Sequence, residues 1–171
     1  MSPQQIFGLQ LVLGYVPWLL LLGAYGLPWL RSIDHFEVQR GIATLHSFRF
    51  FGLVFILPGV VGADLPAGFA TSAAFGDLAT GILAMLALMT VRVRPLFWLL
   101  VVAFNVVGTA DLLVNYLHGA AFGLPERAGA LAAAYWIPIL YVPLLMITHA
   151  TAFWLLLRQP RTQALPGGAA S

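Results

Sequence analysis

The chain lacks both cysteine and lysine, and each absence removes a class of chemistry. With no Cys among its 171 residues, disulfides, thiolate metal sites and cysteine nucleophiles are excluded. All eight basic residues are Arg, so Schiff-base chemistry at a lysine, including a retinal of the usual kind, is excluded as well. The formal charge of +2 is too small and too scattered for nucleic-acid binding, and we expect no nucleic-acid partner.

Charged residues of either sign are also scarce. They make up 8% of the chain, and hydrophobic residues make up 61%, whereas a soluble domain carries roughly 25% charged residues. So few charges cannot cover a water-facing surface, and we therefore expect the lipid bilayer to surround most of the protein. The composition predicts an all-α fold, a polytopic transmembrane helical bundle.

Apolar stretches long enough to cross a membrane, which takes about 20 helical residues, occur five times along the chain. They cover residues 6–30, 42–62, 70–91, 95–117 and 131–157. Four prolines inside these ranges are interpreted as kinks, because neighbouring helices can satisfy the freed carbonyls; they are Pro17, Pro58, Pro138 and Pro143. We expect residues 1–159 to form a single five-helix membrane domain. Residues 160–171, rich in Gly, Ala and Pro, are predicted to be a disordered cytoplasmic tail.

The arginines predict the orientation of the five spans. The segments that five spans place on one side carry Arg31, Arg40, Arg92, Arg94, Arg158 and Arg161, whereas the opposite side carries only Arg127. Cytoplasmic loops carry an excess of basic residues. We therefore expect the N-terminus outside, the C-terminus in the cytoplasm, and the protein in the inner (plasma) membrane of a bacterium.

Polar groups inside the predicted spans are the candidate ligand or proton site. Ionisable residues in a span usually face the bundle interior and pair with one another. The candidates are His46, Arg49, Asp77, Asn105, Asp111 and His149. Counting a rise of about 1.5 Å per residue, we expect an inner layer with the two histidines and Arg49, and an outer layer with the two aspartates.

Two helix faces are predicted to pack together around these groups. A semi-polar stripe recurs at helical spacing in the fourth span, at Asn105, Gly108, Asp111, Leu112 and Asn115. The third span has a face of small residues around Asp77, formed by Ala73, Ala74, Thr80, Gly81 and Ala84. Small residues let helix backbones approach closely, so the most economical arrangement brings the two faces into contact.

Three interpretations of the polar groups remain open. In the first they are architectural: Arg49 pairs with Asp77 or Asp111, and the histidines bond to Tyr, Thr or backbone partners. In the second they bind a small ligand or pass a proton. In the third His46 and His149 ligate haem b, or these histidines join the two aspartates around a metal. The layering separates the His pair from the Asp pair, so we assign no metal site.

Three stretches resemble a group of small, uncharacterised bacterial inner-membrane proteins. They are HSFRFFGLVFILPGVVGADLPAGFATSAAFGD at 46–77, NVVGTAD at 105–111 and IPILYVPLLMITH at 137–149. The resemblance implies a multi-pass membrane protein and brings no activity, ligand or partner. The resembling stretches contain the same six candidate residues. The cost of burying polar groups in lipid also predicts these residues.

The functional expectation is an integral membrane protein with a buried His/Arg/Asp cluster. We expect it to handle a small ligand or a proton, or to act as an accessory membrane subunit; the alternative is an intramembrane redox protein or enzyme that binds haem or a metal. No catalytic residue is assigned, and a non-enzymatic protein is favoured. The chain is small for a solitary transporter and has no inverted repeat, so we expect a homo-oligomer or a larger membrane complex.

Overall fold

The computed structural model describes residues 1–158, and the regular elements of this part of the chain are all helices. Among these residues the only β feature is an isolated bridge between Pro58 and Val61. The tail expected at 160–171 lies outside the described residues.

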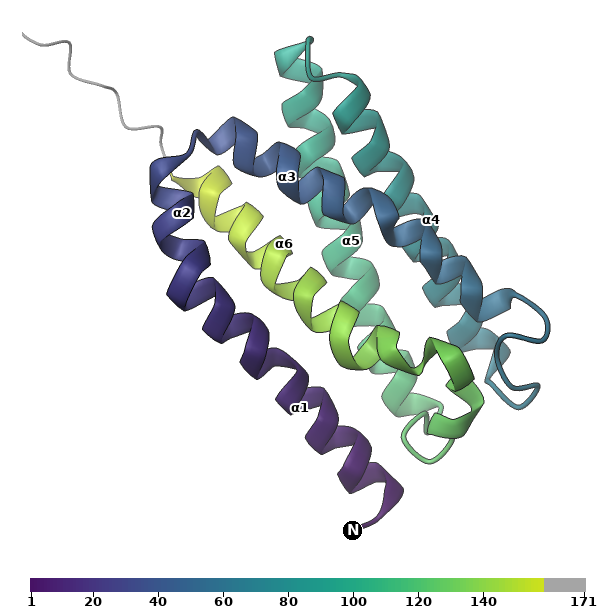
Figure 1. Cartoon of the computed structure of the whole chain (residues 1–171). Coiled ribbons are helices and arrows are strands. Elements are labelled where there is room, and N and C mark those ends of the chain that lie inside the picture. The colour runs from purple at the N-terminus through teal and green to yellow at the C-terminus, as the bar shows by residue number, and fades with distance from the viewer. Residues whose placement is uncertain (159–171) are drawn as a thin grey trace, which may run out of the picture.

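The first helical segment, Pro3–Ser32, lies at the edge of the bundle (Figure 1). It consists of α1 (Pro3–Leu21), a π-helical turn η1 (Leu22–Gly26) and α2 (Leu27–Ser32). Its start is fixed by a capping box, in which Ser2 and Gln5 satisfy each other's backbone N–H groups. The segment packs against η4 and α6, and only 11% of its most apolar window is buried. Most of its surface therefore faces the surroundings of the protein.

The second segment changes its winding halfway along. It begins as α3 (His35–Ser47), with the Asp34 side chain accepting from the N–H of Phe36, and continues directly as a 3₁₀ helix, η2 (Phe48–Ile56). A 3₁₀ helix has three residues per turn, so side chains at i, i+3 and i+6 form one row. That row is Arg49, Gly52 and Phe55, and these are the buried residues of η2.

The end of this segment differs from the sequence prediction. The expected range 42–62 is helical only to Ile56. Pro58 lies beyond the helix end, next to Gly59 with φ 81° in a turn, so its interpretation as a kink is wrong. Proline has no N–H to continue a helix and glycine readily adopts positive φ, which explains why the chain turns here.

Three further segments complete the bundle. A short turn joins α4 (Ala67–Met89) to α5 (Arg94–Ala121), which runs antiparallel to it. A loop then leads into η3 (Ala128–Tyr135), a π-helical turn η4 (Ile137–Tyr141) and α6 (Val142–Leu157). Pro138 and Pro143 lie in the first turn of η4 and of α6, at the two positions where the winding of this segment changes.

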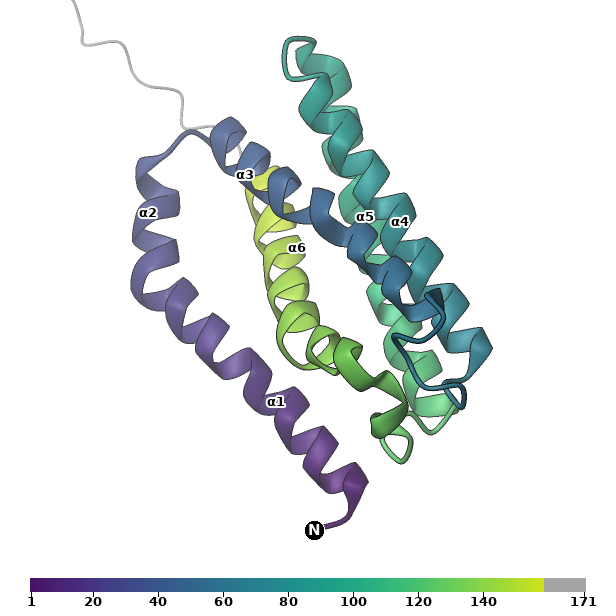
Figure 2. The same cartoon turned by 45° about the vertical axis from the view of Figure 1, so that its right-hand side comes forward.

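The connections lie at two opposite ends of the bundle (Figures 1 and 2). The α2–α3 turn, the α4–α5 turn and the end of α6 lie at one end; the N-terminus, the η2–α4 loop and the α5–η3 loop lie at the other. One apolar cluster near the first end contains Phe36, Phe97 and Phe104. A second, near the other end, contains Phe55 and Leu131. The polar candidates lie between these two apolar layers.

Four helical segments are long and apolar enough to cross a membrane. They are Pro3–Ser32, Ala67–Met89, Arg94–Ala121 and Ile137–Leu157. The segment α3–η2 is not among them; α3 has 13 residues and η2 has 9, so neither helix is long enough to cross a membrane by itself. The protein is thus a membrane-embedded helical bundle with four candidate spans in its described part.

Candidate functional site

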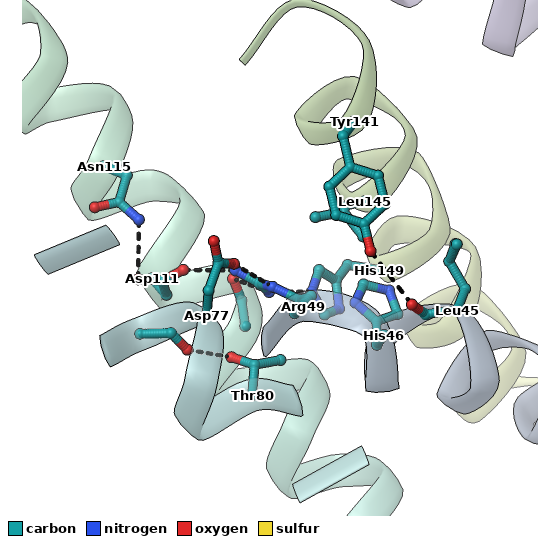
Figure 3. Close-up of polar contacts among 12 residues, drawn as sticks. Leu45, His46, Arg49, Asp77, Thr80, Asp111, Asn115, Tyr141, Leu145 and His149 are labelled. Atoms are coloured by element: carbon teal, nitrogen blue, oxygen red, sulfur yellow. Dashed lines mark hydrogen bonds and ion pairs between the residues drawn. The ribbon is translucent and has the colours of Figure 1, made fainter. Parts of the chain in front are cut away.

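Arg49 is the centre of the polar cluster and is fully buried. Its position in the inward row of η2 directs its side chain between α4, α5 and α6 (Figure 3). A guanidinium is always charged and presents five N–H donors, so a buried Arg is tolerated only where acceptors surround it.

Two carboxylates on different helices share this guanidinium. The Arg49 Nε donates to Asp77 Oδ1 on α4 at 2.6 Å, and Nη2 donates to Asp111 Oδ2 on α5 at 2.5 Å. The side chains of Arg49, Asp77 and Asp111 are 0%, 11% and 7% exposed. The second oxygen of Asp111 accepts from Asn115 Nδ2, one turn further along α5, at 2.9 Å. The two ion pairs therefore connect η2, α4 and α5 through one side chain.

His149 on α6 extends the cluster from the other side of Arg49. Its Nδ1 lies 2.8 Å from Asn105 Oδ1, and the Asn105 amide is oriented by donating from Nδ2 to the carbonyl of Val101. Since a carboxamide oxygen only accepts, Nδ1 carries the hydrogen of a neutral imidazole. The His149 Nε2 then accepts from Arg49 Nη1 at 3.3 Å, while the carbonyl of Gly108 lies 3.3 Å from the same Nη1.

His46 lies against His149 with its ring centroid 4.0 Å away and the ring planes 34° apart. Its Nε2 is 3.0 Å from Thr148 Oγ1. The Thr148 hydroxyl donates to backbone carbonyls of its own helix, so it accepts from a His46 Nε2–H. This leaves Nδ1 of His46 as the acceptor nitrogen, and within residues 1–158 it is buried without a hydrogen-bond partner.

Three glycines make room for the ionic groups. A Cβ on Gly108 would lie 2.6 Å from both Arg49 Nη1 and His149 Nε2. A Cβ on Gly52 would overlap the Asp77 carboxylate, and one on Gly76 would overlap the Asp111 carboxylate. Each of the three packed helices thus lacks a side chain at the point where a charged group of a neighbour lies.

All six sequence-predicted site residues lie in this one cluster: His46, Arg49, Asp77, Asn105, Asp111 and His149. The two expected layers are in direct contact, because Arg49 spans the distance between them. The expected pairing of Arg49 with one aspartate is in fact a pairing with both.

The predicted contact between the faces of α4 and α5 is only partly correct. Gly76 on α4 does meet Asp111 on α5. Gly81, however, lies against the backbone of Ser47 and Phe50, where α3 passes into η2. The small residues of α4 therefore admit both α5 and the second helical segment.

Sequence reasoning missed several residues of the site. Gly52 and Gly76 carry no polar group and were not singled out, although Gly52 follows Arg49 by three residues and Gly76 precedes Asp77. Thr148 was also missed, although it directly precedes His149. A search for small residues next to each intramembrane charge would have found the two glycines.

The histidines do not fit the alternative haem site. Their rings are stacked at 4.0 Å, which leaves no space for a porphyrin between them, and both Nε2 atoms already engage Thr148 or Arg49. Within residues 1–158 no three or more His, Asp or Glu side chains are grouped to hold a metal ion. The arrangement fits neither a bis-histidine haem nor a metal centre that combines these histidines and aspartates.

A cavity of about 210 Å³ reaches the cluster from the end where the N-terminus lies. Asp77 and Asn115 are among its lining residues, together with apolar side chains of α1, η2, α4 and α5. Among the described residues, Oδ1 of Asn115 is buried without a hydrogen-bond partner. The polar cluster therefore has one side open to a small internal space.

The fold and the site define an all-helical, membrane-embedded protein with a buried cluster of ionisable side chains. The chain belongs to the family described as "Domain of unknown function (DUF8737)", whose model matches residues 6–157. The match covers all six site residues and every candidate span except for a few terminal residues. Comparisons with curated proteins and with solved structures gave no match.

Proposed function

We propose that this is a proton-handling membrane protein in which Arg49, Asp77 and Asp111 together bind and release one proton. The observation that carries the proposal is that two carboxylates share a single guanidinium in a buried site. With both carboxylates ionised, the three groups have a net charge of −1. An isolated charge is so costly in a low-dielectric interior that the group neutralises instead. A proton shared by the two carboxyl groups removes this charge, as in carboxylate pairs of other proteins.

A row of polar side chains supports a route for that proton. It begins at Asn115 and Asp77, which line the cavity, and reaches Asp111 (Figure 3). Arg49, which keeps its charge, connects the two acids to His149 by hydrogen bonds. From there His46 is in ring contact. Chains of intramembrane acids and histidines are typical of proton relays. The free acceptor nitrogen of His46 extends the row by one further hydrogen-bond acceptor.

We also propose that α3–η2 is a fifth crossing, with the N-terminus outside. The 13 residues of α3 and the 9 residues of η2 extend together over about 37 Å, more than the roughly 30 Å of a hydrocarbon core. Arginines support the direction. Arg31, Arg92, Arg94 and Arg158 lie at the end where α2 meets α3, and Arg127 lies at the other end. In a bacterial inner membrane, this distribution supports a cytoplasmic position for the first end.

The absence of cysteine makes the crossing testable with single introduced thiols. Ile33→Cys and Thr90→Cys lie on the same side of the membrane if α3–η2 crosses it, and on opposite sides if it does not. Labelling of intact cells with a membrane-impermeant maleimide, with and without permeabilisation, distinguishes the two. Association with further copies or with other membrane subunits stays a prediction, which the mass of the detergent-solubilised complex tests.

The proton proposal is tested by infrared difference spectroscopy of the reconstituted protein during a pH titration. We expect one carboxyl C=O band that Asp77→Asn or Asp111→Asn abolishes, because either change balances the guanidinium with one carboxylate. The matched control is Asp64→Asn, which removes an exposed carboxyl group in the η2–α4 loop and leaves this band in place. A wild-type protein without the band at any pH contradicts the proposal, as does a band that survives both cluster substitutions.

A further inference from the structure

The cavity beside the cluster has the features of a ligand site distinct from the ionic contacts themselves. Its volume is about 210 Å³, and an apolar cavity of about 150 Å³ is enough to bind benzene. Its walls include the aromatic rings of Phe7, Phe55 and Phe69. A ring-sized apolar body with a short substituent therefore fits the space.

The two polar groups where the cavity meets the cluster, Asp77 and Asn115, offer acceptor oxygens. The Asn115 Nδ2 donates to Asp111, and this hydrogen bond orients the amide. Its Oδ1 is left as an acceptor, and this atom is buried without a partner among the described residues. Figure 3 shows this oxygen pointing away from Asp111. Asp77 gives only one oxygen, Oδ1, to Arg49. A molecule that satisfies these groups must therefore carry hydrogen-bond donors.

Charge adds a second requirement. The cluster behind Asp77 and Asn115 has one carboxylate in excess of its guanidinium. At the rim, Gln4 lines the cavity and its Nε2 donates to Glu126. This hydrogen bond holds the pKa of Glu126, which is fully exposed in the α5–η3 loop, below its ordinary value. The end of the cavity at Asp77 and Asn115 therefore favours a positive charge.

From these observations we infer that the cavity binds a small apolar amine, with its ammonium group at Asp77 and Asn115 and its apolar body between α1, η2 and α4. The ammonium supplies three donors and the charge that the cluster lacks. This inference rests on the proposed function in one respect: the same excess carboxylate that binds a proton attracts the ammonium. Amine and proton then compete for one site, so binding of the amine releases the proton.

Binding of three matched probes tests the inference. Benzylamine, benzyl alcohol and toluene have the same ring and differ in the polar group. With protein in detergent micelles and empty micelles as the blank, calorimetric titration is expected to give benzylamine an affinity about tenfold above that of benzyl alcohol. Toluene is expected to bind more weakly still. Equal affinity for toluene and benzylamine overturns the inference, as does a co-purified lipid that benzylamine does not displace.

Variants locate the site. Ala73 lines the cavity, and Ala73→Leu is expected to fill it and to abolish benzylamine binding. Ala79→Leu makes the same change on an exposed face of α4 and is expected to leave binding unchanged. Asn115→Leu is expected to reduce the preference for benzylamine over toluene. Equal binding by wild type and Ala73→Leu, with the latter shown to be folded by its unfolding transition, places the amine elsewhere and overturns the inference.

The infrared titration separates the failure of this inference from that of the proposed function. A carboxyl band that titrates without benzylamine binding rejects the amine and keeps the proton site. Benzylamine binding in the predicted order without a titrating band rejects the proton proposal. In that case the amine itself supplies the missing positive charge, and the inference stands on the binding data.

Discussion

The sharing of Arg49 by two carboxylates predicts an unusual pattern of stabilities. Asp77→Asn or Asp111→Asn alone leaves the guanidinium with one carboxylate and exchanges one charged acceptor for a neutral one, which costs about 1 kcal/mol. The double variant leaves a buried guanidinium, 0% exposed, with no anionic partner. Removing one side of a buried ion pair costs about 3–5 kcal/mol. We therefore expect the double variant to lose roughly 1–3 kcal/mol more than the sum of the single variants.

The complementary change is Arg49→Met, which removes the positive charge and leaves two carboxylates without a positively charged partner. It is expected to cost at least about 3–5 kcal/mol. Adding both Asp→Asn changes to Arg49→Met removes all three charges, and we expect this triple variant to recover part of the loss. The triple variant also loses the most polar contacts of the set. A recovery of stability in this variant therefore reports the restored charge balance.

The assay is reversible unfolding in mixed detergent micelles, followed by the fluorescence of the five tryptophans. Glu37→Gln is the control. It breaks an Arg–carboxylate pair with Arg40 in which both side chains are about half exposed, and such a pair is worth less than about 1 kcal/mol. The reasoning is refuted if each single Asp→Asn change costs as much as the double variant, or if the triple variant is as unstable as Arg49→Met.

Two other positions give independent predictions. Gly108→Ala puts a Cβ 2.6 Å from two nitrogens of the cluster, and we expect this overpacking to cost about 1–3 kcal/mol. The control is Gly41→Ala on α3, whose Cβ would meet open space and should not destabilise the protein. Equal losses of stability in the same unfolding assay would contradict the steric account. Gln4→Ala removes the hydrogen bond that lowers the pKa of Glu126, so NMR titration should find this pKa nearer its ordinary value. Because the pKa of Glu126 is lower in the folded protein, the Gln4–Glu126 contact stabilises the fold at pH values above the ordinary pKa. This stabilisation is lost as the pH falls through the lowered pKa. An unchanged Glu126 pKa in the variant would contradict this prediction.

The sequence predicted which polar residues lie together, because the cost of exposing them to lipid does not depend on the details of the fold. His46, Arg49, Asp77, Asp111 and His149 are unfavourable in lipid in any arrangement, so all of them had to meet inside the bundle. Asn105 was found from helical spacing on α5, and it does bond to His149. These inferences use only composition, helical period and the solvent properties of a bilayer.

The contacts themselves were not predictable in the same way. Depth was counted with the α-helical rise, yet from Phe48 to Ile56 the segment is a 3₁₀ helix in which each residue advances about 2.0 Å. Nothing in the local sequence FRFFGLVFI distinguishes 3₁₀ from α winding, since both bury an apolar face. The close fit of Gly52 on Asp77 arises from packing between segments and has no local signal. The end of the helix before Pro58 was misread because proline is tolerated inside other spans of this chain, such as Pro17 in α1.

The 3₁₀ winding of η2 has a consequence for how the chain accepts substitutions. A helix with three residues per turn has three edges, and each edge runs straight along the segment. Every residue from Phe48 to Ile56 lies on one of these edges. The edge of Arg49, Gly52 and Phe55 is buried, while Phe48, Phe51 and Ile56 on the other two edges are exposed. A scan of apolar replacements through η2 should therefore alternate one intolerant position with two permissive ones, a period of about three residues that changes to about 3.6 in α3. A period of 3.6 through both parts of the segment would contradict this winding.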